Sequence, residues 1–136
     1  MRPGAPVGFG LLEEKPWIGL PGNPVSTMVT FELFVRPAIR KMMGQPRPFR
    51  RSVKVTAAER ISVKPRLQHF LRGVVTEGRS GPEARLTGPQ GSGILTSMVQ
   101  ANALLITPEG QFDTPAGTLL DALILNDPVH QEQPGF

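Results

Sequence analysis

The chain has 136 residues, a formal net charge of +4 and no cysteine, which excludes a disulfide scaffold, a cysteine zinc cluster and a thiol nucleophile. Fifteen glycines and fifteen prolines, against seven Phe, one Trp and no Tyr, predict short elements joined by many turns rather than a large helical bundle. The length allows one domain, or a small domain with a piece of another, and we favour the second.

Two short strands are predicted at the start of the chain. Residues 7–12 and 17–20 are mostly apolar, and the polar residues 13–16 between them form a turn. The second strand leads into a loop rich in glycine and proline, after which the pattern changes to that of a helix. This order predicts a strand, a tight loop and a helix.

The loop before the helix has the features of an anion site. Gly22 lets backbone approach a ligand closely, Asn23 can cap the helix, and Pro24 suits its first position. Free amides of the first turn, the positive helix end and the hydroxyls of Ser26 and Thr27 then favour a tetrahedral oxyanion such as phosphate. An ordinary capped strand-to-helix turn explains the same residues equally well.

The helix is predicted over residues 25–43, and it is apolar well beyond one stripe. Pro37 removes an amide donor and crowds the carbonyl of Leu33, which predicts a kink or break near Arg36. Gly44 suits a left-handed cap. Two short strands cannot cover so apolar a helix, so we expect it to pack in a homodimer or to fray.

A linker is predicted at residues 45–48, where two prolines stiffen the chain. Short apolar or β-branched runs follow at residues 53–57, 68–75, 84–87, 103–107 and 118–125. Strands this short and numerous favour a small closed barrel or sandwich that folds autonomously. The polar tail after Leu125 reads as a frayed terminus. The predicted fold class is therefore α+β.

Basic residues are concentrated in one stretch. Ten of the fifteen lie between Arg36 and Arg66, where Glu59 is the only acid. Such a stretch serves nucleic acid, an anionic metabolite or solubility, and without interleaved aromatics we favour a solvated face and expect only weak, salt-dependent DNA binding. No apolar run approaches the ~20 residues that span a bilayer, so we expect a soluble protein with no membrane partner. The absence of disulfides agrees with a reducing cytoplasm, where we expect the protein to be located.

Arg72 is the residue of the barrel region that most favours a ligand. It shares a strand face with Phe70 and Val74, so it needs a bound anion, or else a rim position beside Glu77 or solvent. The glycine-rich residues 88–93 predict a second anion-binding loop that runs into a brief helical turn, with Ser92 as its ligand. A plain barrel loop is the alternative.

Several motifs together resemble the MoeA/gephyrin E-domain family of molybdopterin molybdenumtransferases. They are Gly-Leu-Pro-Gly-Asn-Pro-Val-Ser at 19–26, Arg-Pro-Gly at 2–4, Phe-Leu-Arg-Gly at 70–73, Gly-Pro-Gln-Gly-Ser-Gly at 88–93, Ser-Met at 97–98 and Ala-Asn at 101–102. The resemblance covers the last third of family members. It implies the C-terminal part of a MogA-like α/β domain over residues 1–46 and a β-barrel domain over residues 47–136, with Met1 an internal methionine of a truncated frame.

The resemblance also implies a function, namely insertion of molybdate into adenylylated molybdopterin, with Mg²⁺ assisting release of AMP. It implies that molybdate and substrate are bound by Arg2, Pro21, Gly22, Asn23, Pro24, Ser26, Arg72 and Ser92. Ala5 departs from the family, which commonly has lysine there. The resemblance further implies a homodimer in which the loop and Arg72 come from different chains.

The Mg²⁺ ligands of the family lie outside this sequence, so we expect the chain to be inactive alone. Asp113, Asp121 and Asp127 are scattered over predicted turns and a strand, and scattered carboxylates are more often surface groups than a magnesium site. A non-catalytic binding or scaffolding module of the same fold is the alternative function.

Overall fold

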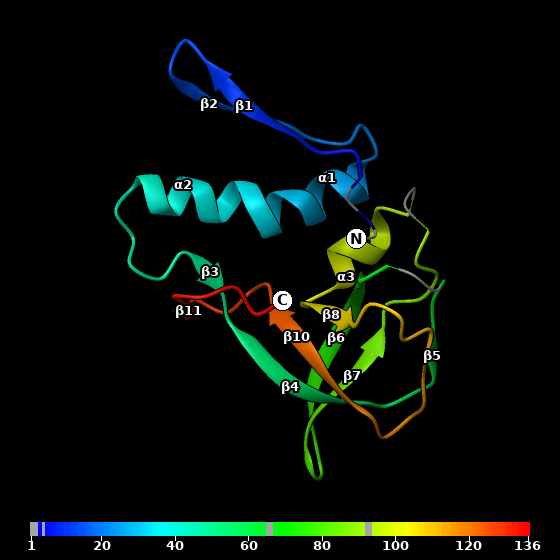
Figure 1. The fold of residues 1–136 in the computed structure, drawn as a ribbon. Helices are drawn as coiled ribbons and strands as arrows, with labels where there is room; N and C mark the ends of the chain where they lie inside the picture. Colours follow the sequence, from blue (N-terminus) through cyan, green and yellow to red (C-terminus); the bar gives the residue numbers. More distant parts are fainter. Residues whose placement is uncertain (1–2, 4, 65–66, 92–93) are drawn as a thin grey trace.

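The computed structural model describes residues 3, 5–64, 67–91 and 94–136. A β-hairpin leads into a helical rod that lies across a small β-barrel, and a short C-terminal tail returns to the rod (Figure 1). Arg2 and Ser92, two of the predicted site residues, lie outside the described residues.

The hairpin consists of antiparallel strands β1 (Gly8–Leu12) and β2 (Lys15–Gly19). Its two-residue turn is formed by Glu13 and Glu14, both with positive φ, at 47° and 64°. Such φ values match the right-handed twist of a tight hairpin. The predicted strand, turn and strand are confirmed, and the hairpin projects away from the barrel (Figure 1).

The helical rod runs through α1 (Pro24–Thr30), the π-helical turn η1 (Phe31–Val35) and α2 (Arg36–Met42). The wide turn closes with the N–H of Arg36 bonded to the carbonyl of Phe31, just before Pro37, which has no N–H to give. The disturbance predicted at this proline is therefore a widened turn within the rod and not a break. Gly44 ends the rod with φ of 74°, as predicted.

Within the described residues, five strands close a barrel in the order β10-β4-β7-β6-β8. They are β4 (Ser52–Ala57), β6 (His69–Gly78), β7 (Gly81–Leu86), β8 (Ala103–Thr107) and β10 (Leu119–Ile124). Each lies at one of the five predicted runs, and the predicted closed barrel is confirmed. The pair β4 and β7 is parallel, whereas the other ladders are antiparallel.

In the part of the chain that the structure describes, four two-residue strands and one short helix complete the fold. They are β3 (Phe49–Arg50), β5 (Ile61–Ser62), β9 (Asp113–Thr114), β11 (His130–Gln131) and α3 (Thr96–Gln100). Two residues are too short for an alternating pattern, so the sequence did not predict these strands. The brief helical turn after the glycine-rich loop was predicted and is α3.

Two hydrophobic clusters lie on opposite faces of the barrel wall, because side chains alternate along each strand. Leu71 and Leu105 point inward with the barrel core. The outer cluster joins barrel and rod, and its buried members are Val25, Val29, Leu33, Phe70, Met98, Leu104, Ile106 and Leu123. The outer barrel face therefore covers the stripe of Val25, Val29 and Leu33, and the expectation that the helix finds no cover within the chain is wrong for this stripe. Phe34, Ile39 and Met42 stay 41%, 41% and 64% exposed, so packing of the rest of the rod in a homodimer stays a prediction.

The C-terminal tail is held against the rest of the molecule. Strand β11 pairs with β3, and the side-chain oxygen of Gln131 accepts a hydrogen bond from the Ser52 N–H at 2.9 Å. The ring of Phe136 packs edge-on against Phe70, with centroids 5.6 Å apart. The predicted frayed terminus is wrong, because the aromatic residue at its end anchors a tail whose composition is otherwise polar.

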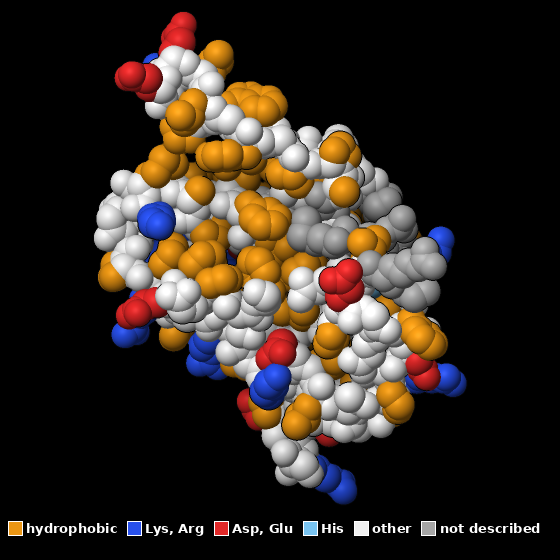
Figure 2. All heavy atoms as spheres, in the orientation of Figure 1, with side chains coloured by type: hydrophobic (Ala, Val, Ile, Leu, Met, Phe, Trp, Pro, Cys, Tyr) orange, Lys and Arg blue, Asp and Glu red, His pale blue; other side chains and the backbone are white. Residues whose placement is uncertain are grey.

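Acids from elsewhere in the chain neutralise much of the basic stretch. The pairs are Arg50–Glu32 at 2.9 Å, Arg51–Asp127 at 3.3 Å, Lys54–Asp121 at 2.9 Å and Arg60–Asp113 at 2.7 Å. Asp113, Asp121 and Asp127, which the sequence analysis did not assign as Mg²⁺ ligands, thus each have a basic partner. Figure 2 shows both charge types interspersed over the barrel, whereas hydrophobic side chains gather over the hairpin and rod. Among the described helices, none is long and apolar enough to cross a membrane.

Candidate functional site

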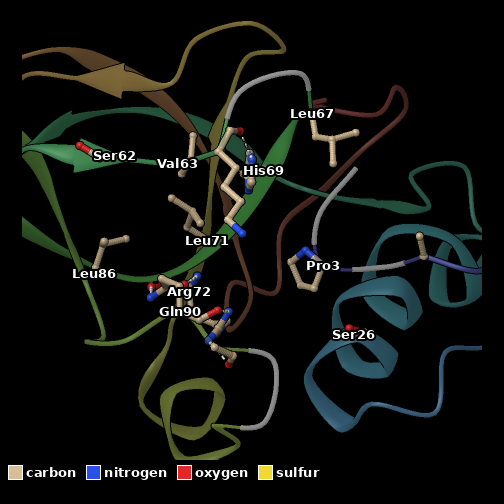
Figure 3. A pocket seen from close by; sticks show the side chains of 13 residues that line it. Pro3, Ser26, Ser62, Val63, Leu67, His69, Leu71, Arg72, Leu86 and Gln90 are labelled. Atoms are coloured by element: carbon tan, nitrogen blue, oxygen red, sulfur yellow. Dashed lines mark hydrogen bonds between the residues drawn. The ribbon is translucent and has the colours of Figure 1, made fainter.

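A pocket of about 720 Å³ lies where the N-terminal segment, α1 and the barrel meet. Its polar lining includes Ser26 on α1, Ser62 on β5, Lys64 after β5, His69 and Arg72 on β6, and Gln90 in the loop after β7. Figure 3 shows Arg72 beside Gln90 on the barrel side, across the pocket from Pro3 and Ser26. Residues from distant parts of the sequence therefore converge on one hollow.

Arg72 is almost fully buried, with 1% of its surface exposed. Its Nε donates to the Ser97 hydroxyl at 3.0 Å, and Nη1 donates to the Gln90 carbonyl at 3.2 Å. Its Nη2 donates to the carbonyls of Gly91 at 3.0 Å and Pro89 at 3.4 Å. Burial lowers the pKa of Arg72, but a guanidinium remains protonated.

The guanidinium group of Arg72 is therefore hydrogen-bonded, but its positive charge is not neutralised. In the described part of the chain no carboxylate pairs with it, and the alternative partner Glu77 lies further along β6, opposite Pro82. Carbonyl and hydroxyl dipoles solvate a cation without cancelling its charge. The pocket wall consequently carries a fixed positive charge in a region of low dielectric, where it acts strongly on an anion.

The side chain of Gln90 also joins the loop to strand β6, because it bonds to the backbone of Arg72. Its side-chain oxygen accepts from the Arg72 N–H at 2.8 Å, and its amide nitrogen donates to the carbonyls of Arg72 at 3.1 Å and Gly88 at 3.0 Å. Asn102 makes a matching pair of bonds to the backbone of Val75, at 2.7 and 2.9 Å. Sequence reasoning gave Gln90 no role, since its only signal is an amide side chain between loop glycines.

The loop before α1 differs from its predicted role. The Asn23 side-chain oxygen accepts from the N–H groups of Val25 at 3.2 Å and Ser26 at 3.3 Å, which confirms the predicted cap. The N–H of Thr27 bonds to the Asn23 carbonyl at 2.9 Å, and Pro24 has no N–H. The first-turn amides expected to face an anion are thus already bonded, because the cap that starts the helix occupies them.

The remaining loop residues lie beside the pocket and not in its lining. Pro21 is buried, and its carbonyl accepts from the Thr27 hydroxyl. Gly22 has no left-handed φ, and a Cβ added there would meet nothing within 4 Å, so its proposed role in ligand approach stays a prediction. Ser26 does line the pocket, together with Arg72, within one chain. The expectation from the resemblance, that the loop and Arg72 of one site come from different chains, stays a prediction.

Lys64 and His69 were not predicted as site residues. His69 is 7% exposed, and its Nε2 lies 2.9 Å from the Lys64 carbonyl, so that nitrogen carries a proton. Lys64 is exposed and lines the pocket. Its only signal in the sequence was membership of the basic stretch.

The described lining of the pocket suits an anion and not a magnesium ion. It contains lysine, histidine and arginine but no Asp or Glu among the described residues. Mg²⁺ prefers oxygen ligands with at least one carboxylate. Across the described residues, no group of three or more His, Asp or Glu side chains is placed to hold a metal ion. The Mg²⁺ implied by the resemblance thus does not fit this pocket.

Comparison with protein families gives a match over the barrel. Residues 54–125 match the model of the MoeA C-terminal region (domain IV). This range runs from within β4 to just beyond β10, so it takes in all of the barrel except the first two residues of β4.

Curated relatives extend the match to the hairpin and rod. Molybdopterin molybdenumtransferase 2 of Mycobacterium tuberculosis is 39% identical over 122 residues, covering 88% of this chain and 29% of that protein. A molybdopterin molybdenumtransferase of Staphylococcus aureus is 29% identical over 133 residues, covering 98% of this chain and 32% of that protein. The chain thus spans about a third of the length of these relatives.

Comparison with solved structures also identifies proteins of molybdopterin and molybdenum cofactor biosynthesis. The molybdopterin biosynthesis moeA protein of Pyrococcus horikoshii OT3 aligns with a TM-score of 0.71 and 30% identity, covering 90% of this chain and 30% of that one. A molybdenum cofactor biosynthesis protein of Pyrococcus furiosus aligns with the same TM-score and 25% identity. Each alignment covers nine tenths of the chain, so it takes in more than the barrel alone.

Proposed function

The chain belongs to the MoeA family of molybdopterin molybdenumtransferases, and we propose that it serves molybdenum cofactor biosynthesis as the C-terminal portion of such an enzyme. In this proposal the family reaction inserts molybdate into adenylylated molybdopterin. Molybdate and molybdopterin are the substrates, and the pocket between α1 and the barrel holds one of their anionic groups.

The observation that carries the proposal is the buried guanidinium of Arg72. It has no carboxylate partner among the described residues, and it borders a pocket that also has Lys64 and the Ser26 hydroxyl in its lining. Fixed cations and hydroxyl donors stabilise a tetrahedral dianion or a phosphate without reorganising.

The same geometry favours positioning over covalent chemistry. Ser97 is the hydroxyl nearest the arginine, but it accepts from Arg72 and donates to the Ile94 carbonyl at 2.6 Å, so it is not poised as a nucleophile. The protein groups in this pocket bind and orient an anion. No step of the proposal runs through Mg²⁺, because the described lining offers it no carboxylate.

We assign residues 1–46 to the end of a MogA-like α/β domain and residues 47–136 to the barrel domain. Exposed apolar residues support a larger assembly, since Phe9 is 75% and Trp17 is 52% exposed on the hairpin. A second copy covers this surface in the homodimer we propose. Arg2, Pro21, Gly22, Asn23, Pro24 and Ser92 remain in the proposal as ligands from the family motifs.

The test is a calorimetric titration of the purified chain with sodium molybdate, with sodium chloride of equal ionic strength as the control. We expect saturable binding of molybdate and no molybdenum transfer to molybdopterin by the chain alone. A chain that fails to bind molybdate overturns the pocket's role. Turnover by the 136-residue chain contradicts its proposed role as part of the enzyme.

A binding or scaffolding module is the second candidate, favoured by the exposed hairpin. In that case removal of apolar side chains from the hairpin, as in Trp17→Ser, abolishes capture of a partner while molybdate binding is absent from the outset. Any DNA binding by the basic stretch is expected to be weak and salt-dependent, and the ion pairs that neutralise it support this expectation.

A further inference from the structure

We propose that Gln90 is a positioning residue of the anion pocket, because its side-chain amide fixes the part of strand β6 from which the Arg72 guanidinium projects. The inference rests on the proposed function and deepens it, since it concerns the same pocket. It gives a role to a residue that was not among the predicted ligands.

The backbone of Arg72 lies at the point where strand β6 loses one neighbour. Strand β7 pairs with β6 only as far as Leu86, opposite Gly73, and the chain then turns at Gly88, whose φ is 105°. The Thr87 N–H donates to the Arg72 carbonyl at 3.1 Å, so the backbone groups of Arg72 face this open edge. Arg72 is buried, and a buried backbone N–H without a partner costs free energy.

The Gln90 side chain supplies the missing partner. Its Oε1 accepts from the Arg72 N–H at 2.8 Å, and its Nε2 donates to the Arg72 carbonyl at 3.1 Å. A carboxamide carries an acceptor and a donor in one plane, as a peptide group does. The side chain of Gln90 therefore continues the hydrogen-bonded ladder of β6 beyond the end of β7.

Gln90 also binds the other end of Arg72. Its backbone carbonyl accepts from Nη1 at 3.2 Å, while its Nε2 also donates to the Gly88 carbonyl at 3.0 Å and so ties the loop to itself. One residue thus holds both the backbone and the guanidinium of Arg72, and both residues line the pocket (Figure 3). A displacement of Gln90 consequently displaces the positive charge.

The position of this charge decides how strongly it acts on an anion. The energy between two charges falls with their distance, and it is least screened where water is excluded, as around the buried Arg72. A cation that is already in place when the ligand arrives needs no reorganisation. Gln90 therefore acts on the ligand through Arg72.

Asn102 offers an internal comparison at the opposite edge of β6. Its Oδ1 accepts from the Val75 N–H at 2.7 Å, and its Nδ2 donates to the Val75 carbonyl at 2.9 Å, just before β8 begins at Ala103. These bonds have the same chemistry as those of Gln90, but Val75 is uncharged, and neither residue is in the described lining of the pocket. Loss of the Asn102 amide therefore tests the effect of stability alone.

The experiment compares molybdate affinity by calorimetry for the wild type, Gln90→Met and the control Asn102→Leu, each well below its thermal midpoint. Both substitutions keep the approximate size of the side chain and remove its amide, so both variants lose stability. We expect Gln90→Met to lower the affinity roughly tenfold to a hundredfold, because a misplaced binding group loses much of its effect. Asn102→Leu should keep the wild-type affinity.

A second measurement separates positioning from stability. The Nε–H of Arg72 donates to the Ser97 hydroxyl at 3.0 Å, so its NMR resonance reports where the guanidinium lies. We expect this resonance to shift in ligand-free Gln90→Met and to stay in place in Asn102→Leu. If Gln90→Met does not fold, Gln90→Asn replaces it, because its amide is one methylene too short to reach the same groups, and the same loss and shift are expected.

The outcomes distinguish the two proposals. If the wild type binds no molybdate, the proposed function falls and this inference with it. If the wild type binds molybdate, then wild-type affinity or an unmoved Arg72 resonance in the folded Gln90 variant overturns only the positioning role. An equal loss of affinity in Asn102→Leu overturns that role as well, since stability alone then accounts for the effect.

Discussion

Replacing Leu33 by alanine tests the contact between the helical rod and the barrel. Leu33 is 2% exposed and lies in the wide turn η1, in a cluster with barrel residues that include Phe70 and Leu104. A buried leucine truncated to alanine loses about 2–5 kcal/mol, which combines the transfer free energy of the lost atoms with the cost of the cavity. The rod crosses the outer barrel face here, so we expect a loss within this range.

The assay is urea unfolding followed by far-UV circular dichroism at two protein concentrations. Met42→Ala is the matched control, because this residue of α2 is 64% exposed and its truncation should change the free energy of unfolding by less than about 0.5 kcal/mol. If barrel and rod unfold together, Leu33→Ala lowers the midpoint and leaves the slope unchanged. The loss of free energy in Leu33→Ala should be the same at both protein concentrations, because Leu33 packs on the barrel of its own chain, even if the midpoint itself rises with concentration in the proposed homodimer.

Two outcomes would refute this reasoning. A loss below about 0.5 kcal/mol in Leu33→Ala would mean that the rod does not rest on the barrel in solution. A loss in Leu33→Ala that grows with protein concentration would mean that a second copy supplies the cover of Leu33. Native-state hydrogen exchange of the α1 amides gives an independent reading, since a rod packed on the barrel is as protected as the barrel strands.

Two further predictions concern packing and pH. In Gly73→Ala the new Cβ lies 2.7 Å from Cγ of the buried Leu105, so thermal unfolding should show that the free energy of unfolding falls by about 1–3 kcal/mol. The control Gly22→Ala has open space around its Cβ, so its free energy of unfolding should not change. Equal midpoints for the two variants would contradict this prediction. The pKa of His130 is lowered, chiefly by burial, and its Nε2 accepts from Arg36 at 2.8 Å. The folded protein therefore binds fewer protons than the unfolded chain, so stability should fall as the pH drops below the ordinary value of 6.5. His130→Gln, which keeps an acceptor but does not titrate, should flatten that part of the stability profile, and an unchanged profile would exclude His130 as its source.

Local patterns were enough to predict the hairpin, the rod and the five barrel strands, but not the four two-residue strands. Alternating apolar runs placed the five barrel strands, and the Asn23-Pro24 pair placed the start of the rod, because strand faces and helix caps depend on residues a few positions apart. Gly44 was predicted as a cap for the same reason, since a left-handed φ is a property of one residue. The family motifs pointed to Arg72 and to the loop after β7.

Tertiary structure alone decided how these elements meet. The outer barrel face, made by Phe70 and its neighbours, covers one stripe of the rod, and no local pattern states which surface a strand's outward side chains will bury. Besides the Ser97 hydroxyl, the partners of the Arg72 side chain are carbonyls 17 to 19 positions away, and carbonyls belong to every residue, so the sequence carries no mark of them. The pocket with Lys64 likewise exists only because three distant segments fold to one place. Helices and strands form because of sterics and hydrogen bonds between residues close in the sequence. The pocket forms because distant segments pack together, and a single sequence does not show which segments will pack.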